Sequence, residues 1–253
     1  MKFDTYIPCD ALKPYVRVLV ISESDIANAY KVLPGTEIVI GFQFKGKLSY
    51  TDHHQEISLS SSGLTGLNDT YRIFNNTEDT GSVLVFFKEG TASAFFKQPI
   101  HEFFRESLSL DNLMMRSELL ILEEKLQEAK SDKQKISVIE NFLISKLNPG
   151  DQDLMVLSAI SMIYKAKGNI RIGDLAKALH TSQSPLEKRF RRKVGTSPKK
   201  FSSLVRFRHS IAQHTPDKPL TDLTYEAGYY DQAHFIKEFR NFTGESPENF
   251  FGR

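Results

Sequence analysis

The chain has little cysteine, no tryptophan and no long apolar run. Cys9 is its only cysteine, which excludes an internal disulfide and a cysteine-rich zinc site. No run approaches the ~20 apolar residues of a membrane-spanning helix. The N-terminus lacks the basic and apolar regions of a secretory signal peptide. These absences predict a cytoplasmic protein with no membrane partner.

Acidic and basic residues are unevenly distributed. Residues 1–153 hold 16 lysines and arginines against 22 aspartates and glutamates, a balance of −6. Residues 154–253 hold 17 against 9, a balance of +8. Basic charge in the C-terminal part would suit a phosphate backbone. A solvated surface can be equally basic by chance, so this signal needs a second one.

An internal repeat provides the second signal. The phrases GTSPKKF (195–201) and GESPENF (244–250) stand 49 residues apart. At the same offset of 49 residues, identical basic and aromatic residues recur: Lys188, Phe190 and Arg191 correspond to Lys237, Phe239 and Arg240. A fixed offset indicates one structural unit built twice. Each unit is typical of a helix-turn-helix, which presents its second helix to the major groove of DNA.

In the first unit, residues 174–179 predict a supporting helix and residues 180–182 a turn. We expect the Ser182 hydroxyl to cap the next helix by accepting a first-turn N–H. The helical period predicts a buried stripe of Leu186, Phe190 and Val194. The outward face and its flanks then hold the candidate DNA-binding residues Gln183, Ser184, Glu187, Lys188 and Arg191.

The second unit repeats this pattern, with a supporting helix over 221–228 and Asp231 as the helix cap. Its inward residues are Phe235, Phe239 and Phe242, and its outward and flanking candidates are Gln232, Ala233, Ile236, Lys237 and Arg240. Alanine and isoleucine suit such a face because apolar groups can contact a thymine methyl. A single outward face could be plain solvated surface, but two matching basic copies favour DNA binding.

Two further helices are predicted around the units. A helix over 198–214 would hold the recognition helices about one DNA turn, ~34 Å, apart. A helix over 154–167 precedes the first unit, and its expected core residues are Leu154, Leu157, Ile160, Ile163 and Tyr164.

The N-terminal part is expected to be a β domain. The apolar runs at 38–44 and 82–87 are typical of strands, and the turn signals between them indicate a small antiparallel sandwich or barrel. Residues 111–147 predict two amphipathic helices broken near Ser131–Asp132. These helices either cover the β domain or form a dimerisation surface through Leu119, Leu122 and Leu126. We therefore expect domains at 1–110, 111–150 and 154–253.

The C-terminal part resembles the AraC/XylS family of bacterial transcriptional regulators. The resemblance rests on DLAKALHTSQSPLEKRFRRKVGTSPKKF and LTDLTYEAGYYDQAHFIKEFRNFTGESPENF. It implies two helix-turn-helix units that read successive major-groove segments. Matched by position, the base-reading residues would be Ser184, Glu187, Lys188, Gln232, Ala233, Ile236 and Lys237. The family usually has arginine in place of Lys188 and Lys237, and lysine lacks the planar fork for bidentate guanine contacts.

The N-terminal part more loosely resembles the cupin-like effector domains of such regulators, through VLPGTEIVIGF, SGLTG and VLVFFKEGTASAFF. A metal-binding cupin would need a His-x-His motif with a later Glu and His. His53 and His54 are adjacent, so a strand would send them to opposite faces. We therefore expect no metal, no cofactor and no catalytic residues, and the ligand-binding residues stay unassigned.

The sequence thus predicts an α+β multidomain protein. It combines an N-terminal cupin-like antiparallel β domain, a helical linker and a C-terminal all-α double helix-turn-helix domain. The favoured function is a sequence-specific, non-enzymatic transcription regulator of double-stranded DNA. Its front domain would sense a small-molecule effector or mediate assembly, such as a homodimer. The alternatives are a cupin-type enzyme with an ancillary DNA-binding module and a nucleoid protein with no sequence preference.

Overall fold

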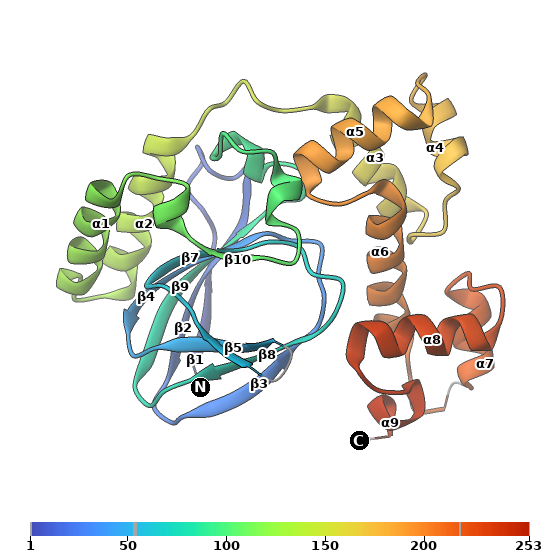
Figure 1. The fold of residues 1–253 in the computed structure, drawn as a ribbon, viewed down its shortest axis with the longest axis horizontal. Coiled ribbons are helices and arrows are strands. Elements are labelled where there is room, and N and C mark those ends of the chain that lie inside the picture. Colours follow the sequence, from blue (N-terminus) through green and yellow to red (C-terminus); the bar gives the residue numbers. More distant parts are fainter. Residues whose placement is uncertain (1, 53–54, 218, 253) are drawn as a thin grey trace.

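The computed structural model describes residues 2–52, 55–217 and 219–252. Its β-strands and the helices α1 and α2 form one part, and helices α3 to α9 form a second part beside it (Figure 1). This arrangement confirms the predicted α+β class, in which a cupin-like antiparallel β domain and a helical linker precede an all-α double helix-turn-helix domain.

The β domain contains two antiparallel sheets. The larger has the order β1 (Lys2–Tyr6), β2 (Val16–Ser24), β9 (Thr80–Phe87), β4 (Val39–Lys45), β7 (Ser62–Thr65) and β10 (Ser107–Ser109). The smaller has the order β3 (Asn28–Val32), β8 (Arg72–Asn76), β5 (Leu48–Asp52) and β6 (Gln55–Ser58). The two runs predicted as strands are β4 and β9. They are neighbours in the larger sheet, where Ile40 stands opposite Val85.

Strands β4 and β9 are covered on both faces. Ile40, Phe42 and Val85 belong to the buried core, and the Phe42 ring meets Phe142 of α2 with centroids 5.9 Å apart. Alternate residues on these strands, such as Val39 and Leu84, line a cavity between the two sheets. Continuous apolar runs are expected where a strand has no solvated face. The cavity therefore explains why these strands lack a polar alternation.

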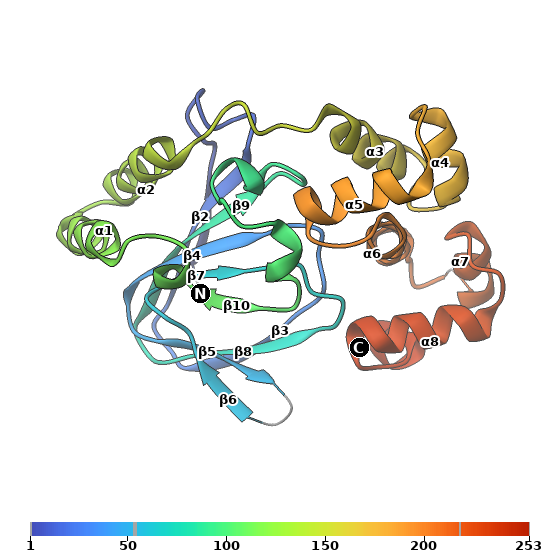
Figure 2. The ribbon, with the colours of Figure 1, turned by 45° about the horizontal axis from the view of Figure 1, so that its top comes forward.

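Helices α1 (Arg116–Glu128) and α2 (Asp132–Lys146) cover the larger sheet at the end away from α3 to α9 (Figures 1 and 2). Leu119, Leu122 and Leu126 are at most 3% exposed and belong to the core. The covering interpretation is confirmed for this face. A dimerisation surface made of these three leucines is wrong, because their side chains already pack inside one chain.

The helical part has the bounds α3 (Leu154–Lys165), α4 (Ile172–Ala178), α5 (Gln183–Val194), α6 (Pro198–Gln213), α7 (Leu220–Glu226), α8 (Gln232–Thr243) and α9 (Pro247–Phe251). The predicted helices fall within two residues of these bounds at nearly every end, as is usual for helix termini. The expected core of α3 is partly wrong. Leu154 is 74% and Tyr164 42% exposed, and the buried stripe runs instead through Val156, Ala159, Ile160 and Ile163.

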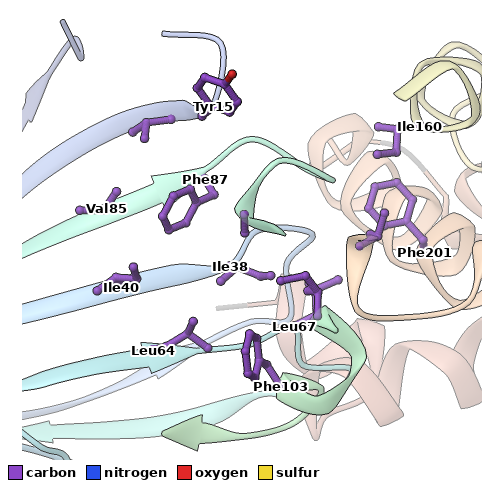
Figure 3. Packing of buried hydrophobic residues seen from close by; sticks show 14 of the residues in the cluster. Tyr15, Ile38, Ile40, Leu64, Leu67, Val85, Phe87, Phe103, Ile160 and Phe201 are labelled. Carbon is purple, nitrogen blue, oxygen red and sulfur yellow. The ribbon is translucent and has the colours of Figure 1, made fainter. Parts of the chain in front are cut away.

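One hydrophobic cluster continues across the boundary between the two parts. Figure 3 shows Leu67 and Phe103 of the β domain on the side that faces Ile160 and Phe201 of the helical part. Polar contacts border this cluster. The Tyr164 hydroxyl lies 2.8 Å from Thr36 Oγ1 and donates to Glu89. Burial and the nearby Glu89 charge raise the pKa of Tyr164. The two parts are therefore packed against each other rather than merely linked.

Candidate nucleic-acid interface

The first helix-turn-helix unit consists of α4 and α5. Leu186, Phe190 and Val194 of α5 are at most 1% exposed. The Phe190 ring meets Phe201 of α6 edge to face, with centroids 5.4 Å apart. The stripe predicted from the helical period is the one that packs, so the opposite side of α5 remains in solvent.

The second unit consists of α7 and α8 and packs through aromatic rings. Phe235, Phe239 and Phe242 of α8 are at most 1% exposed. Phe239 lies at the centre of this packing, with neighbouring ring centroids 5.3–5.5 Å away in Phe207, Phe235, Phe250 and Phe251. Because α6 and α9 supply three of these rings, the orientation of α8 depends on both helices.

The turns of the two units differ by one residue. Each supporting helix is followed by a residue with positive φ, His180 at 52° and Gly228 at 76°. One residue then precedes the cap of α5, whereas two precede the cap of α8. The additional residue is Tyr230, which is 89% exposed beside the start of α8. Tyr230 is not among the residues predicted for the interface, because the repeat aligns by residues after the turn. The adjacent Tyr229-Tyr230 pair was the available signal.

The helix caps also differ between the units. Asp231 caps α8 as predicted, since its Oδ1 accepts from the His234 N–H at 2.7 Å. Ser182 stands at the cap position of α5, but its side chain makes no capping hydrogen bond. The predicted position is right and the predicted hydrogen bond is wrong.

This difference predicts unequal costs of removing the two caps. Asp231→Ala should lower the free energy of unfolding by about 1 kcal/mol, because the first turn of α8 loses a hydrogen bond and a favourable negative charge. Ser182→Ala should cost clearly less, since no bond is lost. Chemical denaturation of the two variants measures both values. Equal losses would show that the Ser182 hydroxyl caps α5 in solution.

The structure places the candidate DNA-binding residues on two solvent-facing surfaces. On α5 and α8 all are exposed except Glu187 and Ile236, which are half-buried. The side chains of Lys188, Lys237 and Arg240 have no hydrogen-bond or ion-pair partner in the described parts of the chain. These three cations are therefore available to an external anion.

One candidate pair is already engaged within α5. Arg191 Nη2 donates to Glu187 Oε1 at 3.1 Å, and the two residues are one helical turn apart. Exposed pairs of this kind contribute only about 0.3–0.5 kcal/mol. A phosphate or base could therefore displace the pair at little cost.

The cavity between the two sheets has a volume of about 350 Å³. Its walls are largely apolar and include Val39, Leu59, Leu64, Phe74, Leu84 and Phe86. Its charged lining residues are Glu37 and Arg72 of the β domain and Arg208 of α6. Arg208 Nη1 lies 3.9 Å from Glu37 Oε2, and the Arg208 side chain is 54% exposed. One residue of the helical part, Arg208, therefore contributes its guanidinium to the lining of the cavity.

Neither a metal site nor a membrane helix was found in the described ranges. They contain no group of three or more His, Cys, Asp or Glu side chains able to hold a metal ion. His53 and His54, the two histidines considered as possible metal ligands, lie outside the described residues. Within 2–52, 55–217 and 219–252, no helix combines the length and apolar character needed to cross a bilayer.

Comparison with known families matched two segments. A helix-turn-helix domain family matches residues 175–253, and a domain of unknown function, DUF6597, matches residues 4–109.

Comparison with individual proteins found regulators. The Msm operon regulatory protein of Streptococcus mutans is 30% identical over 118 residues, which are 45% of this chain and 42% of that protein. The chain therefore aligns with less than half of this relative. ToxT from Vibrio cholerae matches 100% of this chain and 98% of its own, with 14% identity and a TM-score of 0.49. The AraC-like transcriptional activator CuxR matches 83% and 86%, with 12% identity and a TM-score of 0.32.

The fold and the two exposed recognition helices define a DNA-binding protein of the double helix-turn-helix class. The family match to residues 175–253 agrees with these two units, and over 118 residues the chain is similar to an operon regulator.

Proposed function

We propose that this protein regulates transcription by binding duplex DNA in a sequence-specific way through both units. The observation that carries this proposal is the matched pair of exposed faces on α5 and α8. Each face has a lysine at the same place, Lys188 and Lys237, that pairs with no other described residue. Two recognition helices joined by α6 can enter successive major-groove segments on one side of the duplex. A protein with this role works in the bacterial cytoplasm, where the chromosome lies.

The roles of the candidate residues follow from their chemistry. Ser184, Glu187 and Lys188 can all hydrogen-bond to base edges, so we expect α5 to dominate specificity. On α8, Gln232 and Lys237 can hydrogen-bond, whereas Ala233 and Ile236 offer apolar contacts to thymine methyl groups. The remaining candidates are Gln183, Arg191 and Arg240. The two arginines carry charge that suits phosphates.

In vitro selection from a random DNA pool tests this function. The full chain should enrich a site with two conserved segments separated by roughly one helical turn. A pool that stays random while DNA is retained would support a nucleoid protein without sequence preference. Failure to retain any DNA at low salt would contradict the proposal.

The β domain is proposed to bind a small-molecule effector in the cavity between its sheets. A volume of about 350 Å³ falls within the range usual for ligand pockets. Its apolar walls and the guanidiniums of Arg72 and Arg208 suit a molecule with an apolar body and one acidic group. The fluorescent sulfonate 8-anilinonaphthalene-1-sulfonate is a suitable probe. Arg208→Ala should weaken its binding, whereas Lys125→Ala, an exposed change on α1, should not.

The proposed regulator is not an enzyme. The family match favours a regulator over a cupin-type enzyme, and a metal-dependent cupin would contain a stoichiometric transition metal. Elemental analysis of the purified full chain distinguishes these two functions. A stoichiometric content of zinc, iron or manganese would favour the enzyme.

Self-association remains a prediction. The three leucines predicted to mediate it are buried, so a dimer would have to use other side chains. Since Leu119, Leu122 and Leu126 are buried, the apolar side chains still exposed on the two covering helices are Leu120, Ile121 and Ile144. Sedimentation of the full chain and of Ile121→Glu would show whether a dimer forms and whether it uses this face.

A further inference from the structure

The segment 66–72, which leads from β7 to β8, lies between the effector cavity and the helical part. Gly66, Asn68, Thr70 and Arg72 line the cavity. The residues that alternate with them, Leu67, Asp69 and Tyr71, contact the helical part. One thin segment therefore forms the wall of the cavity on one side and a docking surface for helices on the other.

The docking side contacts the C-terminal ends of both recognition helices. A Cβ atom built on Gly195, at the end of α5, would lie 3.1 Å from Ile100 Cγ2 and 3.6 Å from a Leu67 methyl. A Cβ atom on Gly244, at the end of α8, would lie 2.4 Å from the Tyr71 ring. Real side chains do not approach that closely, so only glycine fits against Tyr71. Tyr71 thus packs directly on the glycine that ends α8, and Leu67 lies beside Ile100 at the equivalent glycine of α5.

Asp69 adds a buried polar contact between these two ends. Its carboxylate, 2% exposed, accepts from Arg105 at 2.5 and 2.9 Å and from Lys200 of α6 at 2.9 Å. Its carbonyl oxygen accepts from Asn241 Nδ2 of α8 at 3.2 Å. Burial opposes ionisation, but hydrogen bonds from Arg105 and Lys200 outweigh it and lower the pKa of Asp69. The carboxylate is therefore ionised and paired across the domain boundary.

The cavity side is connected to the same aspartate. Arg72, which lines the cavity, donates to the carbonyl oxygen of Arg105 and to Ser107 Oγ, the latter at 2.7 Å. Arg105 in turn holds Asp69. A ligand acid that draws the Arg72 guanidinium toward itself would disturb the backbone that presents Arg105, and with it the Asp69 contacts. Packed interfaces convert small local shifts of this kind into discrete rearrangements.

We propose that segment 66–72 couples the cavity to the relative placement of the two helix-turn-helix units, with Asp69 as the positioning residue. The coupling rests on the proposed effector and DNA-binding functions. Helix α6 connects the two units, and the segment contacts α6 through Asp69 and Lys200. Both α6 and the β domain therefore determine the distance between the recognition helices. That distance must match the spacing of the two DNA segments. An effector in the cavity changes DNA affinity by altering this match.

Spin-label distances in the full chain, without DNA or effector, test the coupling. Labels are placed at Lys177→Cys on α4 and Tyr225→Cys on α7, both exposed positions outside the proposed DNA faces, in a Cys9→Ser background. Asp69→Asn should shift and broaden the distribution of distances between the labels. Asp10→Asn is the matched control, because Asp10 is 94% exposed and pairs with Lys13 in its own loop; it should leave the distribution unchanged.

The cavity side is tested with added rings. Thr70→Phe places a ring in the cavity from the segment itself and should shift the label distance. Ile57→Phe adds a ring on β6 at an exposed position that does not line the cavity, and should not. If Asp69→Asn fails to fold, Lys200→Met removes the same ion pair from the helical side.

The outcomes separate this inference from the proposed function. A folded Asp69→Asn or Lys200→Met protein with the parental distance distribution would overturn the coupling, as would equal effects of the two added rings. Neither result depends on DNA binding. If the parent protein selects no DNA site, the proposed function fails, whereas the label distances still report on the segment.

Discussion

Phe239→Ala should lower the free energy of unfolding of the helical part by about 3–5 kcal/mol, the usual cost of emptying a large aromatic site in a core. The Phe239 side chain is fully buried. Its ring contacts rings from α6, α8 and α9. Removing the ring leaves a cavity that three separate helices would have to move to fill, so little relaxation is expected.

Thermal or denaturant unfolding of the full chain measures this loss. Arg240→Ala is the matched control, because Arg240 is the exposed neighbour of Phe239 on the same helix. It should change the unfolding free energy by less than about 0.5 kcal/mol. Phe190→Ala should behave like Phe239→Ala in the first unit. A small loss at Phe239 would mean that the aromatic cluster is loosely packed in solution.

Lys188→Ala and Lys237→Ala should each weaken binding to a selected DNA site by about 1–3 kcal/mol, if each lysine contacts a base. Both side chains are exposed and have no partner in the described residues, so no internal contact is lost. The two variants should relax sequence preference at different segments, roughly one helical turn apart. The fold should be unaffected in both.

Affinity measurements over a range of salt concentrations complete this test. Binding should fall steeply with salt in all proteins, because bound cations release counterions from the DNA. Lys125→Ala is the control, since it removes an exposed lysine from α1, at the opposite end of the molecule (Figure 1). Equal and sequence-independent losses from Lys188→Ala and Lys237→Ala would mean that both lysines contact only phosphates.

Much of the helical part could be predicted from sequence because its signals are local. The repeat of Gly195 and Gly244, both with positive φ, follows from helix ends that disfavour any other residue. The stripes on α5 and α8 follow from a period of 3.6 residues. Such features depend on neighbours within one or two turns. The candidate faces for DNA therefore follow from local sequence alone, although their contact with DNA remains a prediction.

Other features depended on residues far apart in the chain. Nothing near Leu119 in sequence indicates whether it meets a sheet or a second copy, and α1 faces the β domain. The Ser182 hydroxyl could cap α5 on local grounds, yet it does not. Tyr164 follows the apolar period of α3, but its hydroxyl bonds to Thr36 and Glu89, more than 70 positions away toward the N-terminus.

The sequence by itself determined that this protein has two helix-turn-helix units with matching basic faces after a strand-rich domain. Helical periodicity, the glycines that end the recognition helices and the balance of charge are all local signals that can be read from the sequence. Only the tertiary structure decided that segment 66–72 lies between the cavity and both units, with Asp69 next to Lys200 and Asn241. These contacts join residues separated by more than 130 positions. Their formation depends on how whole layers pack, which no local pattern encodes.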